Sequence, residues 1–286
     1  MPDALASLEA GLDALDAPAP DAAAPSRPRR WLRVVPPLVA VALFVGLWQL
    51  AYVLEVKESY ALPSPLDVLG SLGEQWSKGT VQEAVKNSLH RGVLGFLASI
   101  LVGTPLGLLI ARVRVVRLGI GPIISGLQSL PSVAWVPAAI IWFGLSDAAI
   151  YFVVLMGAVP SIANGLVAGI DQVPPLYLKV GRVLGAQRLA AARHVVVPAA
   201  LPGYLAGLKQ GWAFSWRSLM AAELITFSPR LGLGLGQLLE TGRELSDMSL
   251  VMASIVVILA VGIGIEMLVF APLERRVLSR RGLAQA

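Results

Sequence analysis

The sequence predicts an all-α integral membrane protein with six transmembrane helices. Of its 286 residues, 56% are hydrophobic and only 14% are charged, and the mean hydropathy is +0.72. Soluble domains carry about 25% charged residues. A helix needs about 20 apolar residues to cross a bilayer, and six segments of that length are nearly free of charge: 36–54, 93–111, 118–145, 148–170, 199–224 and 249–271. Because strand-like alternation is absent and a span must satisfy its own backbone hydrogen bonds, we expect helices.

The basic residues are distributed unevenly between the two sides of this predicted topology. If the N-terminus is cytoplasmic, fifteen Lys and Arg residues lie inside, six lie outside, and Lys209 and Arg217 fall within a span. Cytoplasmic loops of membrane proteins carry such an excess. We therefore expect both termini in the cytoplasm. The net charge of +5 then reflects membrane topology, and no nucleic-acid partner is expected.

The chain is expected to divide into a disordered cytoplasmic tail, 1–30, and a six-helix transmembrane domain, 31–286, with a cytoplasmic loop at 172–197. The tail is rich in Ala, Pro and Asp and has too little apolar surface to order itself. The first span follows this tail and lacks a small-x-small cleavage site, so it reads as an anchor and not as a cleaved signal peptide.

The connection after the first span shows signals of two helix starts. Ser64, Pro65 and Asp67 have the spacing of an N-cap, a first helical position and a capping partner. Segment 80–83 (Thr-Val-Gln-Glu) is a second predicted capping box, at the start of the long helix that becomes span two. The first of these helices is expected to lie on the outer surface with one apolar side formed by Leu66, Leu69 and Trp76. Ordinary helix ends are the alternative reading.

Small residues and prolines mark how the spans pack. The pairs Gly103/Gly107, Gly165/Gly169 and Gly207/Gly211 have the spacing at which helix backbones approach closely in lipid, in a bundle or a dimer. The third span contains Pro122, Pro131 and Pro137. These prolines predict either a simple kink or a helix break of the kind at which transporters bind substrate.

Four ionisable residues fall within the spans: Lys209, Arg217, Glu223 and Glu266. Lys209 and Glu266 lie near the cytoplasmic ends and can extend to the surface, whereas Arg217 lies deeper. Arg217 is expected either to bind an anion in a translocation path through its planar donor fork or to form a structural ion pair with an acid such as Glu223. The candidate pathway residues are Gln128, Ser129, Trp135, Asn164, Trp216, Arg217, Ser218 and Glu223.

The connection between spans four and five predicts a short amphipathic helix in the cytoplasm. Pro174 and Pro175 suit a helix start, and Gly185 suits its end. The apolar strip of this helix, at positions i, i+4, i+7 and i+8, consists of Leu176, Val180, Val183 and Leu184. No apolar partner for the strip is evident within the connection, so it is expected to lie on the membrane or to dock into another protein.

This connection resembles the "EAA" loop of ATP-binding-cassette (ABC) importer permeases, through Arg182-Val-Leu-Gly185-Ala186 followed by Pro198-Ala-Ala-Leu-Pro202. Other motifs resemble the branch of that family that transports aliphatic sulfonates, taurine and nitrate. They are Leu62-Pro-Ser-Pro65, Asn87-Ser-Leu-His-Arg91, Leu130-Pro-Ser-Val-Ala-Trp-Val-Pro137, Ile141-Trp-Phe-Gly144, Trp216 with Ala221-Ala-Glu223, and Gly232-Leu-Gly-Leu-Gly236. The resemblance covers about residues 36–281.

The resemblance implies a type I ABC importer transmembrane domain in the bacterial cytoplasmic (inner) membrane. Its expected partners are an ABC ATPase subunit, an extracytoplasmic substrate-binding protein, a second permease copy in a homodimer and the lipid bilayer. The coupling residues implied are Leu176, Lys179, Val180, Gly181, Arg182, Leu184, Gly185 and Ala186. Lys179 stands where the family's triplet begins with Glu, so the charge partner on the ATPase must differ.

The chain is expected to catalyse no covalent chemistry. It has no cysteine and only two histidines, and it contains no phosphate-binding G-x-x-x-x-G-K-[ST] motif, so ATP and Mg are expected on the partner ATPase. Gly232-Leu-Gly-Leu-Gly236 is not followed by the helix and acid that a dinucleotide site needs, and a flexible external loop is expected there. The alternatives are an ion-coupled secondary transporter, which needs intramembrane acids, and an intramembrane protease, for which neither histidine lies deep enough.

Overall fold

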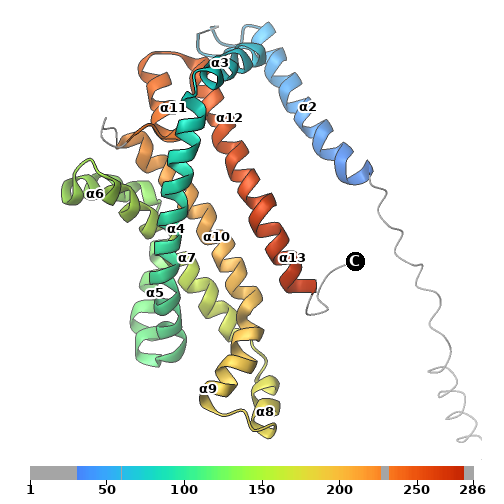
Figure 1. Ribbon diagram of the computed structural model, residues 1–286, viewed down its shortest axis with the longest axis vertical. Helices are drawn as coiled ribbons and strands as arrows, with labels where there is room; N and C mark the ends of the chain where they lie inside the picture. Colours follow the sequence, from blue (N-terminus) through green and yellow to red (C-terminus); the bar gives the residue numbers. More distant parts are fainter. Residues whose placement is uncertain (1–30, 59, 227–231, 280–286) are drawn as a thin grey trace, which may run out of the picture. The chain divides into compact units, whose positions relative to one another are not determined.

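The computed structural model describes residues 31–58, 60–226 and 232–279 (Figure 1). All regular elements in these ranges are helical, which confirms the predicted all-α class. The expected tail, 1–30, lies outside the described residues. The chain divides into two compact units at Leu50 and Ala51, and each is considered by itself.

The smaller unit contains most of α2 (Trp31–Val53), a helix of 23 residues. Its apolar side chains are largely exposed, for example Leu43 and Leu47, which are both more than 60% exposed. An exposed apolar surface along a whole helix is what a segment solvated by lipid requires. Residues Val35–Val53 are accordingly long and apolar enough to cross a membrane.

Three further helices of the larger unit meet the same length and hydropathy requirements. They are α4 (Thr80–Arg112), α7 (Asp147–Asp171) and the long helix Met248–Ser279. The long helix consists of α12 (Met248–Ile265), a π-helical turn (Glu266–Phe270) and α13 (Ala271–Ser279). A fifth candidate is bent by 102° between α5 (Arg114–Ser129) and the segment Ser132–Phe143, which contains η1 (Ser132–Trp135) and α6 (Val136–Phe143). Of the two outcomes that the prolines of the third span predict, a simple kink or a helix break, the structure contains the break.

The fifth expected span, 199–224, corresponds to α10 (Val197–Ile225), which is 29 residues long. It is not among the helices of the described chain that are apolar enough to cross a membrane by composition. The reason lies in its sequence, which includes Lys209, Arg217 and Glu223. Six spans, with both termini on one side, thus remain a prediction.

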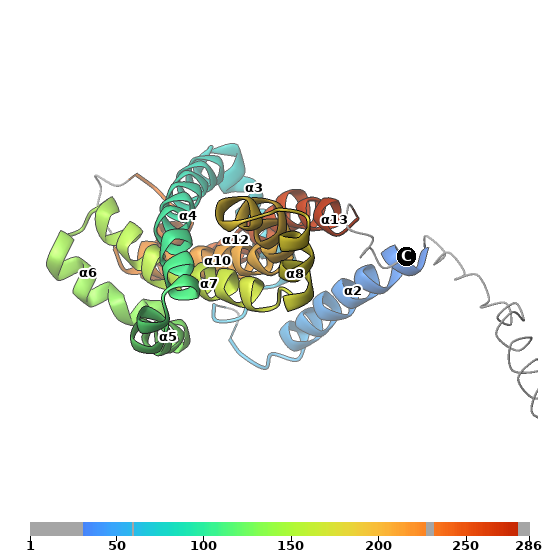
Figure 2. The same ribbon diagram turned by 90° about the horizontal axis from the view of Figure 1, so that it is seen from below.

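The core of the larger unit is formed by α4, α7 and α10, which lie side by side (Figure 2). A Cβ added to Gly165 of α7 would lie 2.3 Å from the Cα of Gly207 in α10. The two backbones therefore touch where glycine leaves room, as the small-residue spacing predicted. Around this contact the interior is filled by apolar side chains such as Ile150, Val154 and Leu219, all fully buried.

The helix preceding α4 begins as its sequence predicted. In α3 (Pro65–Ser77), the Ser64 Oγ accepts a hydrogen bond from the Asp67 amide at 3.1 Å, and the Asp67 carboxylate accepts one from the Ser64 amide at 3.0 Å. The side chains of Leu66, Leu69 and Trp76 are exposed. The second predicted capping box is wrong, although α4 does start at Thr80. Its N-cap is Gly79, whose φ of +78° lets the chain pass from α3 into α4 without a side-chain cap.

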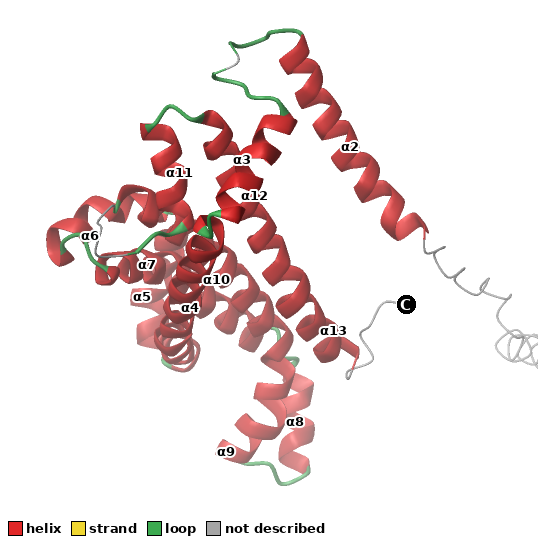
Figure 3. Ribbon diagram, turned by 45° about the horizontal axis from the view of Figure 1, so that its top comes forward, coloured by secondary structure: helices red, strands yellow, loops and turns green. Residues whose placement is uncertain are grey.

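Two short helices project beyond the end of α10 (Figure 3). They are α8 (Pro175–Val183) and α9 (Arg188–Ala191), and the latter continues through a π-helical turn (Ala192–Val196) into α10. Gly185 ends α8 as predicted, with φ +82°. The Ala186 amide donates to the Gly181 carbonyl at 2.8 Å and the Gly185 amide donates to the Arg182 carbonyl at 3.0 Å, which together form a Schellman motif. The remaining helix, α11 (Leu235–Glu244), connects α10 to α12.

Candidate functional site

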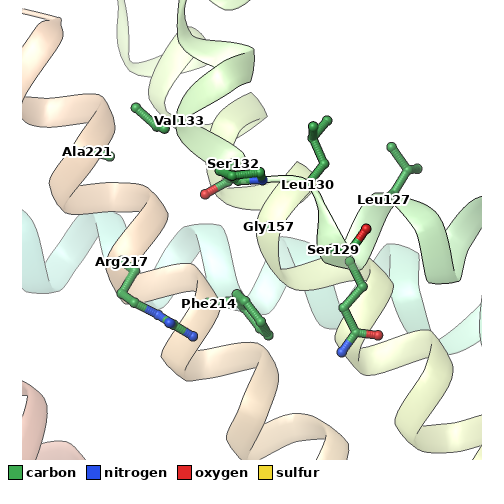
Figure 4. Close-up of a pocket in the computed structure, with 11 residues that line it drawn as sticks. Leu127, Ser129, Leu130, Ser132, Val133, Gly157, Phe214, Arg217 and Ala221 are labelled. Carbon is green, nitrogen blue, oxygen red and sulfur yellow. The ribbon is translucent and has the colours of Figure 1, made fainter.

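A cavity of about 360 Å³ lies at the break between α5 and η1 (Figure 4). Its walls are the segment 127–133, Gly157 of α7, and three residues of α10, namely Phe214, Arg217 and Ala221. The helix break itself therefore forms one side of the cavity, and α10 contributes the only cationic side chain among the lining residues. An interrupted helix beside a cavity is the arrangement that transporters use for substrate sites.

Arg217 is exposed and is held by neutral partners. Its Nε donates to the Ala213 carbonyl at 3.2 Å, and its guanidinium carbon lies 4.5 Å from the centroid of the Phe214 ring. Figure 4 shows these two side chains next to each other on α10. The ion pair with Glu223 considered from the sequence is not formed. Because stacking on an aromatic face and one backbone bond leave most guanidinium donors available, Arg217 can bind an anion.

Polar groups from three helices meet near Arg217. Gln128 and Ser129 of α5 line the cavity, and the Asn164 amide of α7 donates to the Gln128 carbonyl oxygen at 2.6 Å. The hydroxyl of Ser218, which is fully buried, donates to the Ser132 hydroxyl at 2.6 Å and so joins α10 to the helix break. These four predicted residues therefore lie at the cavity or directly behind its wall.

Two predicted aromatic residues lie away from the cavity. Trp135 packs edge-on against Phe152, with ring centroids 6.1 Å apart. Trp216 is buried and stacks on Trp212, again at 6.1 Å. Both side chains contact the apolar core, so their contribution here is to packing.

Glu223, the last predicted pathway residue, is fully buried in a cluster of its own. Its carboxylate accepts hydrogen bonds from the Ser88 hydroxyl at 2.6 Å, from Nη1 of Arg91 at 3.1 Å and from the Gly236 amide at 3.1 Å. The Nε of Arg91 also donates to Asp147 at 2.9 Å. The cluster therefore connects α4, α7, α10 and the start of α11.

The glycine-rich segment is part of this cluster. The Leu235 amide donates to the Ser88 hydroxyl at 2.8 Å, and a Cβ at Gly234 or Gly236 would come within 2.6 Å of Glu223. Since residues 234–236 are buried and hydrogen-bonded, the expected flexible loop is wrong for them. The Gly-x-Gly spacing is the sequence signal of this buried contact, because the backbone can approach a side chain closely only where the residue is glycine.

Further along α11, the Arg243 guanidinium donates a hydrogen bond to the Glu240 carboxyl and so holds the pKa of that carboxyl below its ordinary value.

The α8 helix presents an apolar strip together with basic side chains. Leu176, Val180 and Leu184 are 63%, 50% and 80% exposed, and Lys179 and Arg182 are also exposed. On the opposite side, Gly181 is buried, and a Cβ there would lie 2.9 Å from a methyl carbon of Val195. The side of α8 that carries Gly181 therefore packs against Val195, with Ala186 close by, and the side that carries the apolar strip is exposed.

Lys209 and Glu266, expected to extend separately to the surface, form an ion pair instead. The Nζ of Lys209 lies 2.6 Å from the Glu266 carboxylate and 3.3 Å from that of Glu274. The π-helical turn between these acids places both beside α10. These ion pairs join α10 to the helix that contains Glu266 and Glu274. The residues next to Lys209 in the sequence do not indicate such a contact.

Comparison with known proteins identifies the family. Residues 103–279 match the family described as "binding-protein-dependent transport system inner membrane component". The taurine transport system permease protein of Escherichia coli strain K12 is 29% identical, over 86% of this chain and 89% of that protein. The putative aliphatic sulfonates transport permease protein of Bacillus subtilis is 28% identical (79% and 80%), and the nitrate import permease protein of Synechocystis is 31% identical (68% and 72%).

A solved structure of a methionine ABC transporter in inward-facing conformations has the same fold. It superposes with a TM-score of 0.56 at 18% identity, and the match covers 68% of this chain and 94% of that one. The family match begins in the last third of α4 and extends to the end of α13, and it includes the cavity wall on α10 and the whole α8–α9 hairpin. The chain therefore belongs to the binding-protein-dependent transport system inner membrane components, the permease subunits of ABC transporters.

Proposed function

We propose that this permease subunit provides the pathway by which an ABC importer moves a small anionic solute of the sulfonate, taurine or nitrate type. The observation that carries this proposal is Arg217, an exposed guanidinium in the cavity at the helix break, where its partners are Phe214 and a backbone carbonyl. Two oxygens of one nitrate or sulfonate group can accept paired hydrogen bonds from such a fork. The names of the taurine, sulfonate and nitrate relatives point to the same class of solute.

The proposed assembly contains two copies of the chain in the bacterial cytoplasmic membrane. Each copy has six spans with both termini in the cytoplasm, and α10 is one of the six. An ATPase subunit, which binds ATP and Mg²⁺, docks on the loop 172–197 through the apolar strip of α8. A substrate-binding protein delivers the solute on the other side. The exposure of Leu176, Val180 and Leu184 supports this docking. Contiguous apolar side chains on a protein surface commonly mark a site that binds another protein.

Transport proceeds by alternating access in this proposal. Closure of the two ATPases on ATP draws the two α8 helices together, and the cavity changes from inward-facing to outward-facing. ATP and the loaded binding protein each favour the outward state because each binds it more tightly than the inward state. Arg217 then holds the anion while the binding protein is released.

An ion-coupled secondary transporter is the competing proposal. Such a protein needs an intramembrane carboxylate that can bind and release the coupling ion. In the described part of α7, α10 and the α12–α13 helix, every carboxylate already has a cationic partner: Asp147 and Glu223 with Arg91, Asp171 with Arg117, and Glu266 and Glu274 with Lys209. This pairing favours the ATP-driven mechanism.

Reconstitution distinguishes the two mechanisms. The chain is purified with its ATPase and binding protein, placed in proteoliposomes, and tested for uptake of taurine, an alkanesulfonate and nitrate. We expect uptake of one of these anions that requires ATP on the cytoplasmic face. Uptake driven by a sodium or proton gradient without ATP would contradict the proposal.

A further inference from the structure

We propose that a second cavity, between the end of α4 and the α8–α9 hairpin, is a binding site for the phosphate group of an anionic lipid or for free phosphate. This cavity has a volume of about 440 Å³. Two arginine residues from separate elements line it, one at the last position of α4 and one in α8. The lining residues used in the argument are Arg112, Ile170, Leu178, Arg182, Gln187 and Val196.

The charge around the cavity is positive and uncompensated. The sequence contains no Asp or Glu from Gln172 to Ala222. The nearest carboxylate in sequence, Asp171, is engaged by both terminal nitrogens of Arg117. Within the described chain, neither Arg112 nor Arg182 has a carboxylate at ion-pair distance. Two cations beside one cavity repel each other, and a shared anion removes that repulsion.

The chemistry of the lining fits a phosphate. Guanidinium groups donate two parallel hydrogen bonds to phosphate oxygens, and two of them on different helices can bind the same phosphate from both sides. Gln187 adds an amide donor. The apolar side chains of Ile170, Leu178 and Val196 suit the glycerol and upper acyl carbons of a lipid. Basic pockets between helices on the cytoplasmic side of membrane proteins bind lipid head groups in this way.

An anion in this cavity would affect the hairpin that we propose docks the ATPase. Arg182 belongs to the same short helix as the exposed apolar strip, two residues after Val180. Binding of one phosphate by Arg112 and Arg182 would fix α8 relative to α4. The inference goes beyond the transport proposal, because it concerns a site away from the cavity of Arg217 and holds whichever solute is moved.

The test uses the purified full-length chain in a neutral detergent. Thermal unfolding is followed while dioctanoyl-phosphatidylglycerol, dioctanoyl-phosphatidylcholine or inorganic phosphate is titrated. We expect phosphatidylglycerol to raise the Tm saturably and phosphatidylcholine to do so far less. Both Arg112→Gln and Arg182→Gln should weaken this binding about fivefold, because a basic residue near an anionic head group contributes about 1 kcal/mol. Arg276→Gln, which removes an exposed cation of α13, should bind like the wild type.

The same titrations distinguish the two sources of phosphate. A Tm rise with inorganic phosphate that is lost in both variants identifies free phosphate as a ligand, whereas a rise with the anionic lipid alone identifies the lipid. Arg112→Lys and Arg182→Lys keep the charge and lose the fork, and should bind with intermediate strength. The proposal is overturned if the wild type responds to neither probe, or if the two Gln variants respond as the wild type does.

Discussion

Arg91 and Glu223, which are separated by 132 positions in the sequence, form a buried ion pair with 3.1 Å between Nη1 and Oε1. The Arg91 side chain is 5% exposed and that of Glu223 is fully buried. The pair joins α4 to α10, and the same carboxylate binds the Gly236 amide at the start of α11. Three sequence motifs that looked unrelated along the chain thus meet in one cluster.

Removing one member of this pair should destabilise the protein strongly. Replacing Glu223 by Ala removes a buried carboxylate that binds the buried Arg91 guanidinium, and we expect the free energy of unfolding to fall by about 3–5 kcal/mol. Thermal unfolding in detergent measures the loss. Glu74→Gln is the control, since Glu74 forms an exposed pair with Lys78 and such pairs contribute under about 1 kcal/mol. Equal Tm values for the two variants would refute a structural role for the cluster.

The glycines of the cluster should be intolerant of a methyl group. Gly236→Ala would place a Cβ 2.6 Å from the Glu223 Cβ and 2.7 Å from the Met220 carbonyl oxygen. Overpacking of this kind costs about 1–3 kcal/mol, and unfolding experiments should show a lower Tm. Gly73→Ala is the matched control, because a Cβ there meets nothing within 4 Å and Ala favours a helix. A Gly236→Ala protein as stable as the wild type would be incompatible with this packing.

The end of α8 is expected to be essential for ATPase association. Gly185→Pro forces φ from +82° to about −65° and removes the amide that donates to the Arg182 carbonyl. We expect the variant to insert into the membrane normally and to lose co-purification with the ATPase. Gly185→Asn is the control, because Asn tolerates the left-handed conformation, and it should retain most of the association. Normal co-purification of Gly185→Pro would rule out α8 as the docking helix.

Features set by neighbouring residues could be predicted from the sequence. The cap of α3 at Ser64, the end of α8 at Gly185 and the break near Pro131 each depend on a few adjacent positions, and the structure contains all three. The start of α4 was placed correctly, but Gly79 replaced the expected cap because its left-handed conformation already turns the chain.

Contacts between distant residues could not be predicted. Arg91 appears in the sequence only as the end of the Asn87–Arg91 motif, Glu223 is a possible partner of Arg217, and nothing connects Lys209 with Glu266, whereas the structure pairs Arg91 with Glu223 and Lys209 with Glu266. Each of these pairs depends on which helix faces are brought together, and a single sequence carries no signal of that. Similarly, the cavity near Arg217 arises only when the helix break of the third span is placed beside α10.

The most direct test of the account is the dependence of uptake on the charge of Arg217. ATP-driven uptake of the anion that the wild-type importer accumulates is compared for Arg217→Gln and Arg217→Lys, with ATPase association as the control. A hydrogen bond to a charged group contributes about 1.5–3 kcal/mol, so we expect uptake at low solute concentration to fall about 10- to 100-fold in Arg217→Gln and less in Arg217→Lys. Uptake by Arg217→Gln at the wild-type rate would contradict the assignment of this cavity as the anion pathway.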